Sequence, residues 1–409
     1  NHVLLSSLDE TIIQHGAEFN LGLHKYQGEN YSPKGHKYIV SFEWEQVPTW
    51  TYRVGGVLLK KEISFDTSIY RIYVRYTLLD AHSETTLRLR PFLAFRSVRQ
   101  WTHENNVANR SYDEVENGIR MCLYQGYPDL YMQTSKPAQW NYCPDWYRGM
   151  DYPKERERGY NATEDLLVPG YFEMPIKKGE TITFSAGVAP IKPEQIDVML
   201  EKEIANIDHR DSFYHCLVNA AHQFRATKDD ESYILAGYPW FKPRARDTFI
   251  SMPGLTLAIG EKDRFEAYMA TAEKALYNFM HKEPMSVDIY EMEQPDTLLW
   301  ATWTIQQYAK YTSRKACYEK YGNLLKDIMA FIWKGLHPNL FLHENGLLYA
   351  NGRDHAITWM NSQDGGRPVV PRSGYIVEFN ALWYNALKFF EQMLEENGKQ
   401  EDEDIKNTI

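Results

Sequence analysis

Three segments of the sequence are rich in arginine, carboxylate and aromatic side chains, a combination that suits sugar binding. They cover residues 237–248, 291–300 and 355–387. An arginine beside an aspartate presents hydrogen-bond donors and acceptors together, as vicinal hydroxyl groups require. Aromatic rings stack on the flat apolar faces of sugar rings. If the segments lie at one end of a common scaffold, they predict a pocket for a neutral polyhydroxylated ligand.

The first segment holds the adjacent residues Arg246 and Asp247, preceded by Tyr238 and Trp240. We interpret the Arg-Asp pair as a clamp for sugar hydroxyl groups and the two aromatic residues as part of the pocket wall. The alternative is that Asp247 is the N-cap of a helix, a position that aspartate favours. That alternative explains Asp247 but not the arginine and aromatic residues around it, and both interpretations stay open.

The second segment places Asp296 after Pro295 and directly before an apolar run that ends at Trp300. Apolar surroundings raise the pKa of a carboxyl group, and a general acid needs a raised pKa near neutral pH. Asp296 is therefore a candidate proton donor. Its simpler alternative role is again to cap the helix that follows.

The third segment must contain a loop at Gly365-Gly366, with Trp359 before it and Glu378 after it. Both side chains are candidates for the lining of the pocket. Trp359 has an alternative role as a core aromatic residue. His355, at the start of the segment, is interpreted as a structural histidine rather than a catalyst.

The elements that must position these segments differ between the two halves of the chain. Up to about residue 190 the sequence has short alternating runs, such as residues 68–79, which predict antiparallel strands in a β-sandwich. After Pro190, apolar residues at helical spacing predict an α/α arrangement of helices and loops without strands. The spacing marks helices around residues 196–204, 213–224, 263–279, 298–311, 321–332 and 382–393. We expect the functional segments on loops at one end of these helices.

The formal net charge of −10 argues against two classes of partner. Nucleic-acid binding needs a basic surface, and binding to an anionic membrane needs the same. No run approaches the ~20 apolar residues of a membrane span. No signal peptide is visible, although a start at Asn1 leaves a removed one open.

The cysteine and histidine residues give no sign of a metal centre. Cys122, Cys143, Cys216 and Cys317 are scattered, with no Cys-x-x-Cys pair. Reduced thiols and a cytoplasmic location are expected. Because nucleophile and phosphate-loop motifs are also missing from the sequence, we expect neither a metal nor an organic cofactor.

Several strings of the sequence together resemble the bacterial and archaeal-type glycogen debranching enzymes, the amylo-α-1,6-glucosidase family. In the first half they are Y-R-V-G-G-V-L-L-K-K-E, L-R-L-R-P-F-L-A-F-R and R-G-Y-N-A-T-E-D-L-L-V-P-G-Y-F-E. In the second half they are A-G-Y-P-W-F, R-D-T-F-I, Q-P-D-T-L-L-W, T-W-M-N and P-R-S-G-Y-I-V-E-F-N-A-L-W-Y-N-A-L. The resemblance extends over essentially the whole chain. It implies an N-terminal antiparallel β-sandwich over residues 1–190 and an (α/α) helical toroid of the six-hairpin type, incomplete in this chain, over residues 191–409.

The resemblance also implies an activity, the inverting hydrolysis of α-1,6-linked glucose at the branch points of glycogen or limit dextrin. In that family the aspartate that corresponds to Asp296 is the general acid, and Arg246 with Asp247 is similar to the glucose clamp of related glucoamylases. The substrate-binding residues expected on this basis are Tyr238, Trp240, Arg246, Asp247, Trp300, Trp359, Asn361 and Glu378.

Two departures from the family pattern leave alternative functions open. Asn361 stands where the family usually has an aspartate, so hydrogen bonding to the substrate is expected to be weaker. An inverting enzyme needs a second carboxylate about 6.5–9.5 Å from the acid, and we expect that base beyond Ile409, in a protein of which this chain is a part lacking both ends. The alternatives are another exo-glucosidase, similar to glucoamylase or trehalase, and a non-catalytic glycan-binding protein.

Overall fold

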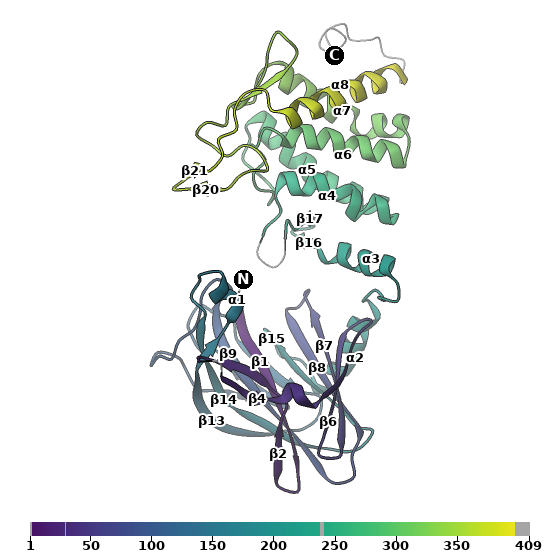
Figure 1. Cartoon of the computed structure of the whole chain (residues 1–409). Coiled ribbons are helices and arrows are strands. Elements are labelled where there is room, and N and C mark those ends of the chain that lie inside the picture. The colour runs from purple at the N-terminus through teal and green to yellow at the C-terminus, as the bar shows by residue number, and fades with distance from the viewer. Residues whose placement is uncertain (1, 29, 238–240, 397–409) are drawn as a thin grey trace. The chain divides into compact units, whose positions relative to one another are not determined.

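The computed structural model describes residues 2–28, 30–237 and 241–396, and the chain divides into two compact units (Figure 1). The first unit, Asn1–His215, is built mainly from strands. The second unit, Cys216–Ile409, is mainly helical. The boundary between the units falls inside helix α3 (Phe213–Gln223). The predicted change from strands to helices along the chain is confirmed.

The first unit consists of two antiparallel sheets. One sheet has the strand order β2 (Ala17–Asn20), β1 (His2–Gln14), β9 (Thr85–Ser97), β14 (Thr163–Ile176), β13 (Gln139–Asp151), β3 (Leu23–Tyr26), β4 (Asn30–Lys34). The other has the order β10 (Asp113–Val115), β11 (Gly118–Met121), β12 (Leu130–Thr134), β15 (Thr181–Gly187), β8 (Arg71–Asp80), β7 (Val57–Asp66), β6 (Pro48–Val54), β5 (Ile39–Trp44). Two short helices, η1 (Gly35–Tyr38) and α1 (Pro153–Glu157), connect strands.

The inner faces of the two sheets share one apolar core. Alternate side chains of a strand point to the same face, so Leu59 of β7, Tyr76 of β8 and Leu89 of β9 are all fully buried in this core. Helix α2 (Pro193–Ala205) packs Ile196 and Leu200 in a smaller cluster of the same unit. The predicted antiparallel β-sandwich is therefore confirmed.

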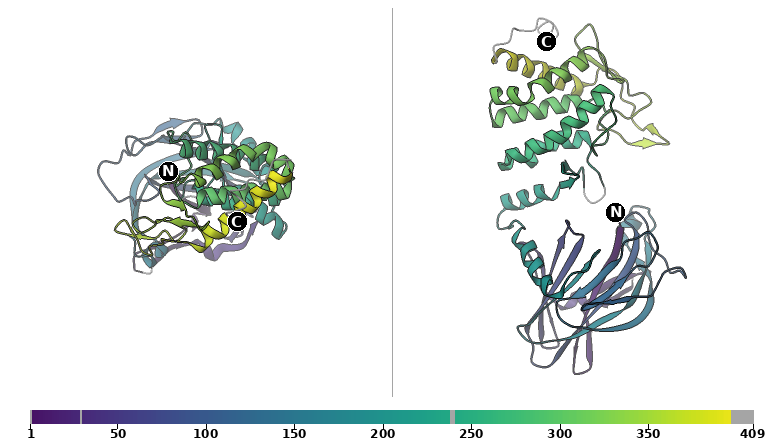
Figure 2. Two further views of the ribbon diagram at one scale, coloured as in Figure 1. Left: turned by 90° about the horizontal axis from the view of Figure 1, so that it is seen from above. Right: turned by 180° about the vertical axis from the view of Figure 1, so that it is seen from behind.

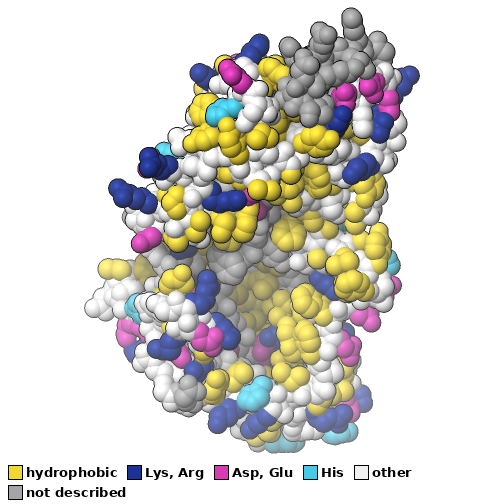
Figure 3. Space-filling view, turned by 45° about the horizontal axis from the view of Figure 1, so that its top comes forward, with side chains coloured by type: hydrophobic (Ala, Val, Ile, Leu, Met, Phe, Trp, Pro, Cys, Tyr) yellow, Lys and Arg dark blue, Asp and Glu magenta, His cyan; other side chains and the backbone are white. Residues whose placement is uncertain are grey.

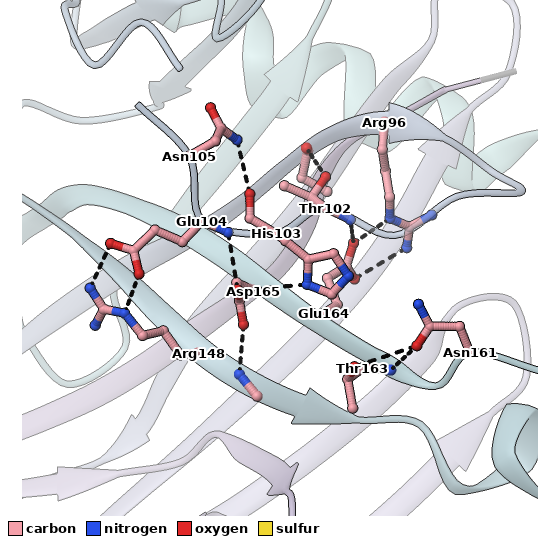
Figure 4. A network of polar contacts seen from close by, with 12 residues as sticks. Arg96, Thr102, His103, Glu104, Asn105, Arg148, Asn161, Thr163, Glu164 and Asp165 are labelled. Carbon is pink, nitrogen blue, oxygen red and sulfur yellow. Dashed lines mark hydrogen bonds and ion pairs between the residues drawn. The ribbon is translucent and has the colours of Figure 1, made fainter. Parts of the chain in front are cut away.

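A network of polar contacts holds the irregular segment that follows β9 (Figure 4). Glu164 of β14 is fully buried and accepts hydrogen bonds from the Arg96 guanidinium, from the Tyr152 hydroxyl at 2.6 Å and from the Thr102 backbone N–H at 3.1 Å. Its neighbour Asp165 accepts from two further backbone N–H groups at 3.0 and 2.8 Å. A buried carboxylate needs this many donors to offset its lost hydration. The network therefore fixes the path of residues 97–105.

The second unit combines helices with short β-hairpins. Its helices after α3 are α4 (Ala245–Leu255), η2 (Leu257–Ile259), α5 (Lys262–His281), α6 (Thr297–Tyr311), α7 (Arg314–Trp333) and α8 (Val377–Glu396). Its hairpins are β16 (Arg225–Lys228) with β17 (Glu231–Ile234), β18 (Leu340–Leu342) with β19 (Leu348–Ala350), and β20 (Gln363–Asp364) with β21 (Arg367–Pro368). The expectation of helices without strands is wrong at these hairpins, because strands of two to four residues are too short to show a period.

Helices α4, α6 and α8 lie side by side and run in the same direction, whereas α5 and α7 return the chain between them (Figures 1 and 2). The Thr304 hydroxyl of α6 donates to the Phe249 carbonyl of α4 at 2.7 Å. Gln306 of α6 and Asn385 of α8 exchange hydrogen bonds of 3.2 and 3.0 Å. The segments that precede α4, α6 and α8 therefore lie at the same end of the helical unit, as the sequence predicts.

The surface of the helical unit carries many apolar and aromatic side chains. Figure 3 shows hydrophobic side chains in patches on its upper part, among lysine and arginine side chains. Trp359, Tyr375 and Tyr384 are among the exposed aromatic residues. None of the described helices combines the length and the apolar character that crossing a membrane requires.

Candidate functional site

Arg246 and Asp247 lie in the first turn of α4, which begins at Ala245. Arg244, and not Asp247, occupies the N-cap position, so the capping alternative for Asp247 is wrong. The Asp247 side chain is exposed at the end of the helix. Tyr238 and Trp240, the aromatic residues predicted for the pocket wall, lie outside the described residues.

Arg246 pairs with Asp296, which follows it by 50 residues. The Arg246 Nε and Nη2 atoms donate to the two carboxylate oxygens of Asp296 at 2.6 and 2.8 Å. Asp296 is buried, at only 3% exposure, and Arg246 is partly buried. A parallel pair of hydrogen bonds of this length is the strong, bidentate form of an arginine–carboxylate contact. The pair fixes the start of α4 to the start of α6.

Asp296 stands at the N-cap position of α6, but its side chain makes no capping hydrogen bond. Its oxygens accept from Arg246 instead, so capping does not account for the side chain. The apolar run that follows turns into the core, because Leu298 and Leu299 are buried. Trp300 is half-buried and meets Trp303 edge to face, with ring centroids 5.5 Å apart. Asp296 is thus held as a hydrogen-bond acceptor at the edge of the core.

Backbone hydrogen bonds join the first and second segments. The Ala245 N–H donates to the Tyr290 carbonyl at 2.9 Å, and the Tyr290 N–H donates to the Pro243 carbonyl at 3.0 Å. The Lys242 ammonium donates to the Tyr290 hydroxyl at 2.9 Å. This bridge explains how residues so distant in sequence keep Arg246 and Asp296 in register.

The third segment forms its own polar cluster at the start of α8. Glu378 accepts from Arg372, at 3.0 Å for Nη2, and from the Trp359 indole N–H at 3.2 Å. The hydrogen bond from Arg372 lowers the pKa of Glu378, although partial burial opposes the shift. Trp359 is 63% exposed, so its alternative role as a core residue is wrong. Asn361 is exposed on the same loop.

The Arg246–Asp296 pair and the Glu378 cluster therefore lie at one end of the helical unit, but each is held by its own hydrogen bonds. Among the described residues, no hydrogen bond or ion pair links Arg246 or Asp296 to Glu378. Together they present guanidinium donors, carboxylate acceptors and an exposed indole, which is the inventory that a neutral polyhydroxylated ligand uses. The second carboxylate that inverting chemistry requires is not identified among these contacts.

His337 is a residue of this unit that the sequence analysis does not select. It is buried beside Phe279, with ring centroids 5.5 Å apart, and its Nδ1 accepts from the Asn339 N–H at 3.0 Å. Burial lowers the pKa of His337 to about 4, although the Glu293 carbonyl opposes the shift. His355, interpreted from the sequence as structural, is exposed instead. A lone His-Pro dipeptide gives no signal of such burial in the sequence.

The solved structures to which this chain is similar include carbohydrate enzymes, at low similarity. A bacterial glucoamylase complexed with acarbose shares 11% identity with a TM-score of 0.43, and the match covers 100% of this chain and 60% of that one. An inverting mannosidase from Bacteroides thetaiotaomicron shares 10% identity with a TM-score of 0.33, over 96% of this chain and 63% of the mannosidase. This chain thus spans less than two thirds of either protein. Likenesses this distant carry no assignment of function.

Family comparisons give a direct assignment. No curated protein matches the sequence. The sequence model described as "Glycogen debranching enzyme N terminal" matches residues 1–183, which form most of the β-sandwich unit. The model described as "Amylo-alpha-1,6-glucosidase" matches residues 214–408, which include Arg246, Asp296 and Glu378. Because these two models follow each other in one chain and together span nearly all of it, the protein belongs to the glycogen debranching enzyme family.

Proposed function

We propose that this chain is part or all of an α-1,6-glucosidase that removes glucose from the branch points of an α-glucan such as limit dextrin. The observation that carries the proposal is the amylo-α-1,6-glucosidase match over residues 214–408, within which α4 and α6 join a partly buried arginine to a buried carboxylate. The net charge of −10 is compatible with a neutral polysaccharide and unfavourable for a polyanion.

In this proposal Asp296 is the proton donor, and Arg246 controls when it can act. Both oxygens of Asp296 accept hydrogen bonds from Arg246, so in this proposal Arg246 turns away before the carboxyl group meets the substrate. Hydroxyl groups of the terminal glucose would compete for the guanidinium of Arg246, and exposed Asp247 would accept from the same sugar. Once Arg246 turns to the sugar, the Asp296 carboxyl group is left to face the glycosidic oxygen.

The proposed chemistry is an inverting displacement. Asp296 gives its proton to the glycosidic oxygen as the bond from that oxygen to C1 of glucose breaks. A water molecule, deprotonated by a second carboxylate, forms the new C1–O bond on the opposite face of the ring. Glu378, Trp359, Trp300 and Asn361 are proposed to line the pocket, with Glu378 as an acceptor for sugar hydroxyl groups.

Replacing the proposed acid tests the function directly. In Asp296→Asn we expect glucose release from limit dextrin to fall by about 100- to 10,000-fold, the usual contribution of a general acid. Glu293→Gln changes an exposed carboxylate of the same segment and should leave the rate within about threefold. Normal glucose release by Asp296→Asn would reject the assignment of the acid. Activity on α-1,4 or α,α-1,1 linkages, with none on α-1,6, would select the other exo-glucosidases.

A non-catalytic glycan-binding protein is the second candidate. It is favoured by the engagement of both Asp296 oxygens and by the amide at Asn361. Isothermal titration of a maltooligosaccharide, paired with a sensitive glucose assay on limit dextrin, separates the candidates. Binding without glucose release over a day of incubation would favour the binding protein.

A further inference from the structure

A cluster of three aromatic rings lies next to the start of α8 and has no role in the proposed hydrolysis. It consists of His343 and Tyr349 of the β18–β19 hairpin and Tyr375 of the segment that leads into α8, and we call it the aromatic corner. His343 and Tyr375 are exposed, the latter by 46%, and Tyr349 is half-buried. Exposed rings contribute little to a core, so core packing does not account for the cluster.

Two of the rings are parallel, and the third is perpendicular to both. His343 stacks on Tyr349 with centroids 5.2 Å apart and planes 8° apart. Tyr375 stands perpendicular to both, at 5.5 Å from His343 and 5.9 Å from Tyr349. His343 Nδ1 and the Tyr375 hydroxyl share a hydrogen bond of 2.7 Å. The rings are thus held in one orientation in the absence of any ligand, which reduces the entropy lost on binding.

Polar contacts attach the hairpin rigidly to α8. The Asn380 side chain accepts from the Leu348 N–H at 2.8 Å and donates to the Leu348 carbonyl at 3.0 Å. The Trp383 indole N–H donates to the Gly346 carbonyl at 3.3 Å. A backbone bridge between Ala350 and Gly374 holds the base of the segment that carries Tyr375. The aromatic corner is therefore fixed on the same helix that carries Glu378.

The aromatic corner is also close to the candidate site along the chain. Tyr375 lies between Arg372 and Glu378, the two residues that form the ion pair at the start of α8. A ligand that contacts both Glu378 and Tyr375 would extend along this segment. A polymer chain extends in this way, whereas a single glucose does not.

We propose that the aromatic corner binds the α-1,4-linked glucan chain to which the branch is attached, and so selects polymers over short substrates. The choice of α-glucan rests on the proposed function. The rings offer flat apolar faces, and the Tyr375 hydroxyl and His343 Nε2 offer polar edges, a pattern that suits sugar rings.

Binding of maltoheptaose, a linear α-1,4 glucan, tests the proposal by isothermal titration with the whole chain. Tyr375→Ala should weaken binding by about 3- to 10-fold, the size of one aromatic stacking contact. Tyr375→Phe keeps the ring and loses the hydrogen bond to His343, and should stay within about threefold of the original protein. Tyr375→Leu keeps apolar packing without a ring, and should bind as weakly as Tyr375→Ala.

Controls separate this role from folding and from catalysis. Tyr384→Ala removes another exposed tyrosine of α8 and should leave maltoheptaose binding unchanged. Failure of the original protein to bind maltoheptaose, or unchanged binding by Tyr375→Leu, would overturn the proposal. If no glucose is released from limit dextrin or isomaltose, the proposed function fails, but weaker maltoheptaose binding by Tyr375→Leu would still support the aromatic corner.

Discussion

Asp296 and Arg246 compensate each other's charge at a position that is largely shielded from water. Both side chains are largely buried, and both carboxylate oxygens are used by the guanidinium. Taking each ion out of water costs several kcal/mol, which the attraction and the two hydrogen bonds offset only while both partners are present. The loss of either residue leaves an unpaired charge between α4 and α6.

This dependence predicts a non-additive effect on stability. Arg246→Met should lower the unfolding free energy of the helical unit by about 3–5 kcal/mol, because the Asp296 charge is left unpaired. The double variant Arg246→Met/Asp296→Leu should recover most of that loss, since no buried charge remains. Urea denaturation followed by circular dichroism measures both values. Arg314→Met, which breaks an exposed ion pair with Glu396, should cost about 0–1 kcal/mol. Equal losses in the single and double variants would show that the pair is not coupled.

His337 makes the stability of the helical unit depend on pH. Its ring is buried, and its Nδ1 already accepts the Asn339 N–H, so a proton at Nδ1 would face another donor. Burial holds the pKa of His337 at about 4, below its ordinary 6.5. Between these values the unfolded chain binds a proton that the folded chain does not, so stability is full above pH 6.5 and falls as the pH drops toward 4.

A histidine substitution should remove this pH dependence. From pH 7.5 to pH 5 the original protein should lose about 2 kcal/mol of stability through His337. His337→Gln keeps an acceptor for the Asn339 N–H but does not titrate, so that part of the loss should vanish. Unfolding free energies of the helical unit at the two pH values provide the test. The control His355→Gln replaces an exposed histidine and should retain the full pH dependence of stability. Full pH dependence in His337→Gln would show that another group is responsible.

At the scale of elements, each carboxylate of the candidate site lies at the N-terminus of a helix. Asp247 lies in the first turn of α4, Asp296 at the N-cap position of α6 and Glu378 in the first turn of α8. Each N-terminus carries partial positive charge, which stabilises a nearby carboxylate by about 0.3–1 kcal/mol. Because α4, α6 and α8 run in the same direction, the fold places acceptors repeatedly at one end of the unit.

The helical period predicts most of these elements from the sequence, but not all. The spacing of Leu298, Ile305 and Tyr308 marks α6, and all three side chains are buried as it requires. The apolar spacing does not mark helix α4, which contains Pro253; only the capping alternative for Asp247 places a helix there. The β-hairpins escape prediction because their strands hold too few residues to show alternation.

The candidate site is predictable in its residue types and less so in its pairings. The sequence identifies Arg246, Asp296 and Glu378, but it assigns Asp296 apolar surroundings and pairs Arg246 with Asp247. The actual partner of Arg246 is brought to it by the bridge at Tyr290, a long-range contact that no local pattern encodes. The role of Asn380, which anchors the aromatic corner, likewise depends on long-range hydrogen bonds to Leu348.

At the scale of the whole molecule, each unit has its own large hydrophobic core. The main core of the β-sandwich unit includes Leu59 and that of the helical unit includes Leu298, and both side chains are fully buried. A core of this kind can maintain a fold by itself, since burial of apolar surface is the dominant favourable term in folding. The cysteines of both units are free thiols, so no disulfide among the described residues ties one core to the other.

Separate cores predict separate responses to substitution. Leu59→Ala and Leu298→Ala each delete a buried side chain and should each cost about 2–5 kcal/mol in the unit concerned. Hydrogen exchange measured by mass spectrometry assigns that cost to peptides, because slowly exchanging core amides report the free energy of opening. In Leu59→Ala, amides of β7 and β8 should exchange at least about 30-fold faster while those of α6 keep their rates, and Leu298→Ala should show the reverse. Equal acceleration in both units by either variant would mean that the chain opens as one cooperative body, and sandwich variants would then be expected to change glucose release through stability alone.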